Sequence, residues 1–164
     1  MVPANNLQFL KEKIQELNSA LFFNTSNAVL KLPNSIVSAL RVDDAGQIWF
    51  FMNRPEQYLH EFDKEFPAKL DFFRKGKWFY LHVTGKAFIV SDPEELNEIV
   101  NVTDDVRRKA MNHLVLIKFK INNAEYYDHT IEPNGTLQKM KTSVMKFLFG
   151  ERQSYRPYRL EPSY

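Results

Sequence analysis

The chain lacks cysteine and long hydrophobic runs. Without cysteine it can have no disulfide, no thiolate metal ligand and no cysteine nucleophile. No apolar stretch approaches the roughly 18 residues that span a bilayer, and no basic segment followed by an apolar run opens the sequence. We therefore expect a cytoplasmic protein that does not enter a membrane.

Familiar catalytic and metal-binding motifs are also missing. The sequence contains no G-x-S-x-G, no Walker loop, no G-x-G-x-x-G and no H-E-x-x-H. These motifs mark hydrolases, phosphate-loop enzymes, dinucleotide-binding enzymes and zinc peptidases. The histidines are scattered along the chain, at His60, His82, His113 and His129. We therefore predict no metal site, and we assign no catalytic residue.

Length and composition indicate one folded domain. A chain of 164 residues with 44% hydrophobic and 14% aromatic residues can fill a sizeable core. We predict a single domain at 1–150, with its barrel core at 28–128, and a basic aromatic arm at 151–164.

The net charge of +2 is unevenly distributed, because residues 137–164 carry six Lys or Arg against two Glu. The arm is typical of a segment that packs on a partner subunit. Binding of nucleic acid through its Arg and Tyr side chains is the alternative, but we do not expect a nucleic-acid partner.

Hydrophobic periodicity predicts the order of the elements. Residues 6–21 have the alternating three- and four-residue spacing of an amphipathic helix. Segments with strand composition follow at 28–32, 36–42, 46–54, 68–73, 77–90 and 114–121. Helical segments are expected at 55–66, where Pro67 ends the helix, and at 93–100, 104–111 and 143–148. Sequential hairpins dominate, which favours an α+β fold with an antiparallel barrel of six or seven strands and three or four helices.

Three local signals sharpen this prediction. The turn Asp43–Gly46 is expected to join two strands as a hairpin. Gly85 lies in a long strand and indicates a bulge or bend. Asp92 precedes Pro93 and is expected to cap a helix at its first turn.

Two strands and the turns after them resemble a known family. The segments are 49–53, 83–87 and 90–94, which read Trp-Phe-Phe-Met-Asn, Val-Thr-Gly-Lys-Ala and Val-Ser-Asp-Pro-Glu. They resemble the pyridoxamine 5′-phosphate oxidase-like split-barrel flavoproteins. The segment Glu-Tyr-Tyr-Asp at 125–128 resembles the general stress protein subgroup. The resemblance covers roughly residues 28–128 and implies a Greek-key split barrel with flanking helices.

The resemblance also implies a cofactor site. Members bind FMN, a small planar ligand, at a homodimer interface, with the strand end that matches 51–53 along the flavin and the following residues near its phosphate. The physical needs are a flat apolar slot for the ring and cations for the phosphate. The candidate cofactor-binding residues are Trp49, Phe50, Phe51, Met52, Asn53, Arg54, Lys86 and Tyr126. For the aromatic residues, a place in the barrel core is the alternative.

The sequence departs from the family at the phosphate loop. Many members carry Ser-Arg-Lys after the aromatic strand, whereas this chain has Glu56, Gln57 and Tyr58. Losing two cations and gaining a carboxylate replaces attraction with repulsion beside a phosphate, so FMN affinity should fall. The leading hypothesis is an FMN-binding flavoprotein, a flavin-dependent oxidoreductase of unspecified substrate. The alternative is a non-enzymatic split-barrel dimer that has lost FMN and serves as a stress-related or ligand-binding module.

Overall fold

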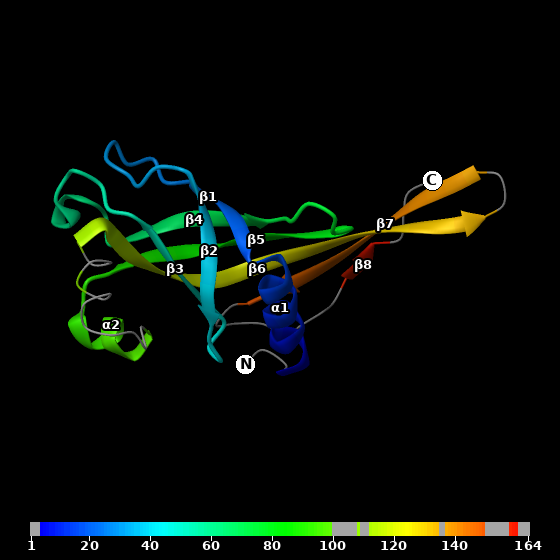
Figure 1. Cartoon of the computed structure of the whole chain (residues 1–164), viewed down its shortest axis with the longest axis horizontal. Coiled ribbons are helices and arrows are strands. Elements are labelled where there is room, and N and C mark those ends of the chain that lie inside the picture. Colours follow the sequence, from blue (N-terminus) through cyan, green and yellow to red (C-terminus); the bar gives the residue numbers. More distant parts are fainter. Residues whose placement is uncertain (1–3, 100–107, 109–111, 135–136, 150–157, 161–164) are drawn as a thin grey trace.

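A closed antiparallel barrel forms the body of the protein in the computed structural model (Figure 1). The structure describes residues 4–99, 108, 112–134, 137–149 and 158–160. Its elements are α1 (Ala4–Leu17), β1 (Ser19–Asn24), β2 (Ser35–Val42), β3 (Gln47–Asn53), the 3₁₀ helix η1 (Leu59–Glu61), β4 (Glu65–Phe72), β5 (Phe79–Val90), α2 (Pro93–Ile99), β6 (Leu114–Asn134), β7 (Leu137–Leu148) and β8 (Tyr158–Leu160). Neighbouring strands follow the order β3-β2-β1-β4-β5-β6, and β3 also pairs with β6, so six strands close on themselves. The predicted α+β class with an antiparallel barrel is confirmed.

The long strands β5 and β6 carry the sheet beyond the barrel. β6 pairs with both β3 and β5 in its first half and with β7 along its second half. In Figure 1 the β6–β7 hairpin extends away from the barrel, and β8 lies beside β7. The barrel itself therefore comprises only β1 to β5 and the first part of β6.

The core fills the barrel and continues under α1. Phe22, Phe50, Phe72 and Phe119 are among the largest fully buried side chains. One face of α1 closes the barrel, because Leu10, Ile14 and Leu17 are all buried in the same cluster. Inward residues alternate with outward ones along each strand, as a barrel with one solvated face requires.

The predicted helix at 6–21 was too long. α1 ends at Leu17, and Asn18 adopts a left-handed conformation with φ of 64°. The Asn18 N–H donates to the Ile14 carbonyl at 2.7 Å, which ends the helix in the way asparagine permits. The chain then enters β1, where Ala20 and Phe22 face the core. Residue 21 fitted the helical spacing only because it continued an apolar run.

Three further predictions of local structure were wrong. Residues 28–32 form no strand, and the expected helix at 55–66 is reduced to η1. The residues after η1 instead begin β4, in which Phe66, Ala68 and Leu70 alternate into the core. Pro67 is exposed within β4, and its carbonyl oxygen accepts the Thr25 N–H at 3.1 Å. The segment 143–148 is part of β7 rather than a helix.

Several turn predictions were correct. The turn Asp43–Gly46 joins β2 to β3, and a register shift at Thr84 and Gly85 marks the expected bulge. The Asp92 carboxylate accepts the Glu94 N–H at 2.9 Å and caps α2. Apart from residue 108, the helix expected at 104–111 lies outside the described residues, as does most of the arm at 151–164. Among the described helices, none is long and apolar enough to cross a membrane.

Candidate functional site

The aromatic strand β3 divides its side chains between the two faces of the barrel wall. Ile48, Phe50 and Met52 point into the core and are almost completely buried. Trp49 and Phe51 point outward and belong to a second, smaller hydrophobic cluster. The alternation follows from the two-residue repeat of a strand. Of the aromatic residues proposed from sequence, only the outward ones can face a ligand outside the barrel.

The pairing of β3, β6 and β5 places their outward side chains in rows. Trp49 is in register with Lys118, which is in register with Phe88. In the next row Leu116 lies between Phe51 and Val90. This outer wall is apolar toward the end of β3. It becomes basic toward the start of β3, where Lys118 and Lys120 of β6 lie.

Helix α2 covers part of this outer wall. Its Leu96 is buried against Trp49, Val90 and Leu116. Beside this contact, the Lys118 Nζ lies 5.4 Å from the Trp49 ring centre and 2.7 Å from the Glu95 carboxylate. The half-buried ion pair and the cation–π contact attach α2 to the wall.

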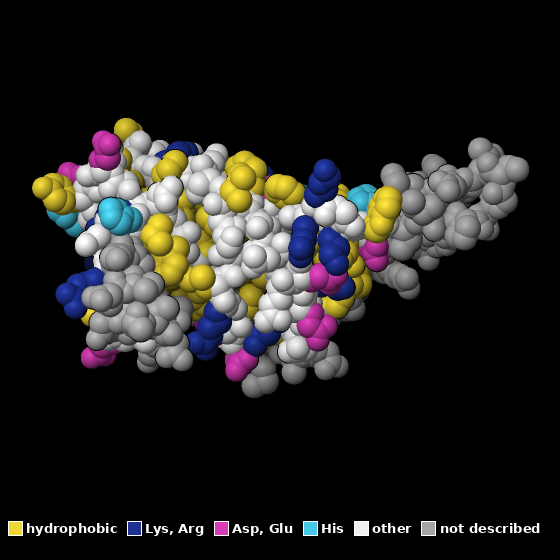
Figure 2. Space-filling model, in the orientation of Figure 1, with side chains coloured by type: hydrophobic (Ala, Val, Ile, Leu, Met, Phe, Trp, Pro, Cys, Tyr) yellow, Lys and Arg dark blue, Asp and Glu magenta, His cyan; other side chains and the backbone are white. Residues whose placement is uncertain are grey.

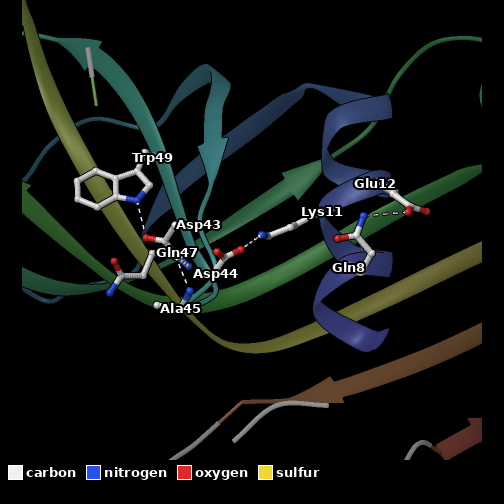
Figure 3. A network of polar contacts seen from close by, with 8 residues as sticks. All are labelled: Gln8, Lys11, Glu12, Asp43, Asp44, Ala45, Gln47 and Trp49. Carbon is white, nitrogen blue, oxygen red and sulfur yellow. Dashed lines mark hydrogen bonds and ion pairs between the residues drawn. The ribbon is translucent and has the colours of Figure 1, made fainter. Parts of the chain in front are cut away.

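A network around the β2–β3 turn fixes the indole of Trp49 (Figure 3). The indole N–H donates to Asp43 Oδ2 at 2.9 Å. The other Asp43 oxygen accepts the backbone N–H groups of Ala45 and Gln47. Next in the turn, Asp44 pairs with Lys11 of α1 at 2.5 Å, and this contact lowers the pKa of the exposed Asp44 carboxyl. Trp49 is thus held as part of the wall.

An open hollow with a cavity volume of about 100 Å³ lies where β3 ends, β5 ends and β6 begins. This volume is well below the roughly 300–1,000 Å³ typical of ligand pockets, so the hollow alone does not enclose a ligand of that size. The lining consists of Phe51, Arg54, Leu59, Val90, Ser91, Leu96, Leu114, Val115 and Leu116. Seven of these side chains are apolar, so the hollow suits a flat, largely apolar group with a polar end.

Arg54 provides the only charged side chain of that lining. Its backbone N–H donates to the His113 carbonyl at 2.8 Å, which holds the start of the loop against the beginning of β6. The side chain is exposed. A guanidinium at the rim of an apolar hollow can bind one carboxylate or phosphate oxygen pair.

The structure brings together Phe51 and Arg54 of the predicted site residues, with Asn53 exposed between them in sequence. Lys86 is on the outer face of β5 but four residues before Val90, which is about 13 Å along the strand. Its ammonium group pairs with Glu65 at 2.5 Å. Lys86 therefore does not line the hollow.

Tyr126 lies at the other end of the barrel. Its ring packs edge-on against Phe9 at 5.1 Å and lies 5.7 Å from Phe79. Burial, with a contribution from nearby Asp128, raises the pKa of Tyr126 to about 12. It occupies the core position that the sequence analysis offered as the alternative to a flavin contact.

The phosphate-loop residues that depart from the family are all exposed. Tyr58 stacks on His60 with a centroid distance of 5.5 Å and an interplanar angle of 19°. Glu56 follows Arg54 by two residues, so its carboxylate reduces the positive potential at this rim. Within the described part of the chain, no group of three His, Asp or Glu residues is placed to hold a metal ion.

Sequence reasoning missed the lining residues that come from β5, α2 and β6. Val90 and Ser91 do occur in the segment that resembles the family, but nothing in their local pattern indicates a site. Leu114 and Leu116 are ordinary strand residues until the register places them beside Phe51 and Val90. The hollow is a product of strand pairing, which sequence spacing does not reveal.

Comparison with known proteins gives a family match over most of the chain. The family described as pyridoxamine 5′-phosphate oxidase like matches residues 5–147. No curated protein matches the chain in sequence.

Several solved structures share the fold. A protein related to general stress protein 26 from Clostridium acetobutylicum is 14% identical, with a TM-score of 0.56 over 78% of this chain and 92% of that one. The general stress FMN/FAD binding protein from Xanthomonas citri is 16% identical, with a TM-score of 0.54 over 79% and 96% of the two chains. PhzG from Burkholderia lata 383, in complex with tetrahydrophenazine-1-carboxylic acid, is 9% identical, with a TM-score of 0.63 over 98% and 94%. At these identities the likeness establishes the fold.

Proposed function

The chain belongs to the pyridoxamine 5′-phosphate oxidase like family, and from this premise we propose that it is an FMN-binding split-barrel protein. The observation that carries the proposal is the apolar hollow at the end of β3 with Arg54 at its rim. The fold shared with an FMN/FAD binding protein from Xanthomonas citri supports it.

The chemistry of the lining suits the ring of a flavin, and the second copy of the chain proposed below would supply the walls that enclose the ring. Phe51, Leu96 and Leu116 offer apolar surface, and the exposed Arg54 offers charge at one side only. This chemistry suits a flat ring inside and an anionic group outside. When bound, FMN would supply hydride or electron transfer, while the protein binds and orients it and excludes water. An oxidoreductase role is therefore part of the proposal, with no catalytic side chain assigned.

The lining fits the phosphate less completely. A phosphate with nearly two negative charges needs more than one cation or several hydrogen-bond donors, and Arg54 is the only cation in the hollow. We propose that a second copy of the chain packs beside the hollow and completes the site, so that the planar ligand lies at a homodimer interface. A cytoplasmic location stays a prediction.

The second candidate is a split-barrel dimer that does not bind FMN. It is favoured by the exposed loop of Glu56, Gln57 and Tyr58, which adds a carboxylate and no cation near Arg54. In this case the hollow would serve another ligand, as a stress-related or general binding module. The two candidates differ in whether the phosphate group improves binding.

An FMN titration compared with a riboflavin titration separates them. We expect yellow protein or saturable fluorescence quenching at micromolar FMN, with weaker binding of riboflavin, which lacks the phosphate. Arg54→Ala should weaken FMN binding by about tenfold, the typical value of a charge-assisted contact, and leave riboflavin binding almost unchanged. Lys31→Ala is the matched control, because Lys31 lines a separate small cavity. Colourless protein that ignores millimolar FMN and riboflavin alike would reject the proposed function.

A further inference from the structure

Helix α2 forms a wall of the hollow through one side chain, Leu96. The walls from β3, β5 and β6 are tied to one another by backbone pairing, whereas α2 is not part of the sheet. In Figure 1, α2 stands at one side of the barrel, apart from α1. It is therefore a wall that can move without breaking the sheet.

Few contacts attach α2 to the barrel. Of the α2 side chains that the structure describes, at 93–97, only Leu96 is buried. The ion pair described for this helix joins Glu95 to Lys118 of β6 at 2.7 Å, and these two side chains are 39% and 21% exposed. A helix of seven residues gains little stability from its own hydrogen bonds. Elements with so few buried contacts open at a lower free energy than the body of a fold.

The wall beneath α2 is fixed independently of the helix. Trp49 is 6% exposed and packs against Leu96 on this side. Its indole N–H donates to Asp43 at 2.9 Å, and Asp43 accepts two backbone N–H groups of its own turn (Figure 3). None of these hydrogen bonds involves α2. The indole therefore keeps its place when Leu96 moves away, and its flat apolar surface is already formed.

Displacement of α2 would enlarge the site. The closed hollow, with its volume of about 100 Å³, is smaller than the roughly 300–1,000 Å³ of most ligand pockets. Leu96 belongs to the lining of the hollow and also covers Trp49, so moving it away joins the hollow to the outer face of the indole. Phe51 lies two residues from Trp49 on the same outward face of β3. The joined space has a flat aromatic wall that the closed hollow lacks.

The same displacement releases a cation. Lys118 follows Leu116 by two residues on the outward face of β6, about 7 Å along the strand. In the closed form its ammonium group is held by Glu95 and lies 5.4 Å from the Trp49 ring centre. Once Glu95 has moved away, Lys118 borders the joined space with a charge that no longer faces this carboxylate. Arg54 follows the other end of β3, so the two cations stand at opposite ends of the site.

We propose that α2 is a movable cover of the cofactor site, and that Lys118, freed from Glu95 when the cover opens, donates hydrogen bonds to the acceptor end of the bound ring. This inference rests on the proposed function, because it assigns a role at the same site. Arg54 then takes the anionic group and Lys118 the carbonyl oxygens of the ring, so the two cations orient the ligand along the wall. A second copy of the chain encloses the ligand from the outside.

The cover is tested on the ligand-free full chain by acrylamide quenching of Trp49 fluorescence. Trp78→Phe makes Trp49 the only tryptophan, because the sequence contains two. In this background Glu95→Gln should increase the open fraction, and with it the quenching constant, by about threefold, the scale of one partly exposed ion pair. Glu94→Gln makes the same chemical change at an exposed position of α2 and should not alter the quenching. Circular dichroism verifies that each variant is folded.

Titrations with FMN and riboflavin test the role of Lys118. Glu95→Gln should tighten the binding of both flavins by about threefold, because Lys118 no longer has to leave a carboxylate. Lys118→Gln removes the cation, so both flavins should bind about tenfold more weakly. It should also lower the midpoint potential of the bound flavin, since a cation near the ring favours the reduced form. Arg54→Ala differs by weakening FMN alone, and Lys120→Gln, two residues further along β6, is the matched control that should change neither affinity.

Two results would overturn the proposal. Equal quenching of Trp49 with and without Glu95→Gln would show that the ion pair does not hold a cover. Unchanged flavin affinity in Lys118→Gln, or a loss confined to FMN, would show that Lys118 does not contact the ring. If neither the unchanged chain nor any variant binds a flavin, the proposed function and the role of Lys118 fall together, whereas the ligand-free quenching still decides whether α2 opens. The two failures are therefore distinguishable.

Discussion

At the scale of single residues, two adjacent tyrosines differ in what surrounds them. Tyr126 is buried in the core, whereas Tyr127 points outward and donates its hydroxyl to Glu125. The hydrogen bond to Glu125 is the main cause that raises the pKa of Tyr127 to about 12, and burial adds to it. The same bond, with Lys146 nearby, lowers the pKa of Glu125. One contact thus shifts two groups in opposite directions.

The pH dependence follows from the raised pKa of Tyr127. Its ordinary value is 10.0 and its value in the folded protein is about 12. The stability from this group is therefore complete below pH 10 and is lost as the pH rises toward 12. Glu125→Gln should lower the pKa of Tyr127 toward its ordinary value, because the carboxylate that favours the protonated phenol is gone.

Ultraviolet absorbance of tyrosinate during an alkaline titration measures this effect. We expect the late-titrating signal to correspond to Tyr126 and Tyr127 together in the unchanged chain. Tyr127→Phe should remove its own part, and Glu125→Gln should shift that part to lower pH. An unchanged titration curve in Glu125→Gln would show that the hydrogen bond does not control the pKa.

At the scale of elements, the β5–β6 pair depends on one glycine. Gly85 sits at the register shift that bends β5 across β6. A Cβ at this position would overlap the Lys120 carbonyl oxygen and would lie 3.0 Å from the Phe119 ring. Backbone and a buried ring can move little, so Gly85→Ala should lower the free energy of unfolding by about 2 to 3 kcal/mol.

Gly76→Ala is the control for that change. Gly76 has φ of +86°, but nothing lies within 4 Å of where its Cβ would be. Its cost is limited to backbone strain, about 1 kcal/mol. Urea unfolding of the two variants should show the larger loss for Gly85→Ala. Equal losses would mean that the strands do not approach closely at the bulge.

The same scale shows how much of the fold sequence could predict. Gly85, Asp92 and the turn at 43–46 have local chemistry that allows few alternatives, and their predictions were correct. Asn18 is different, because asparagine fits a helix end, a turn or a cap. Without knowing that Asn18 adopts the left-handed conformation, the apolar spacing continues unbroken from α1 into β1. Phe62 and Phe66 likewise fit a helical period, but Phe62 directly follows η1 and Phe66 lies in β4.

The candidate site was predicted less well than the fold, for a related reason. Phe51 at the end of β3 and Arg54 just after it were both named from sequence and both line the hollow, and their binding role stays a prediction. The other walls come from β5, α2 and β6, and only the long-range register brings them beside Phe51. Tyr126 and Phe50 are aromatic residues of the kind that line ligand sites, but strand alternation turns both side chains toward the core. The sequence shows which residue types are present, but it does not show which of them lie together on one face of the barrel.

At the scale of the whole molecule, β2 exposes an apolar surface next to β3, the strand that contributes Phe51 to the hollow. Ile36 is 74% exposed and Leu40 is 51% exposed, and Ile36 is in register with Leu21 of β1. Figure 2 shows exposed hydrophobic side chains on the face that carries β2. Because β2 pairs with β3, a second copy bound here would lie beside the end of β3. This surface is the expected contact of the proposed homodimer.

Ile36→Lys tests the dimer and its link to the cofactor site. A two-fold contact loses two buried isoleucines at once, which costs about 3 to 6 kcal/mol and should raise the dimer Kd by at least a hundredfold. Light scattering after size exclusion should then shift from twice 19.4 kDa to 19.4 kDa. Val29→Lys makes the same chemical change at a fully exposed loop position and should leave the dimer intact. If FMN binding falls with the dimer in Ile36→Lys, the second copy completes the phosphate site. If the unchanged chain already has a mass of 19.4 kDa in solution, it is a monomer and the proposed contact is ruled out. Arg54 would then have to hold the phosphate without a partner subunit.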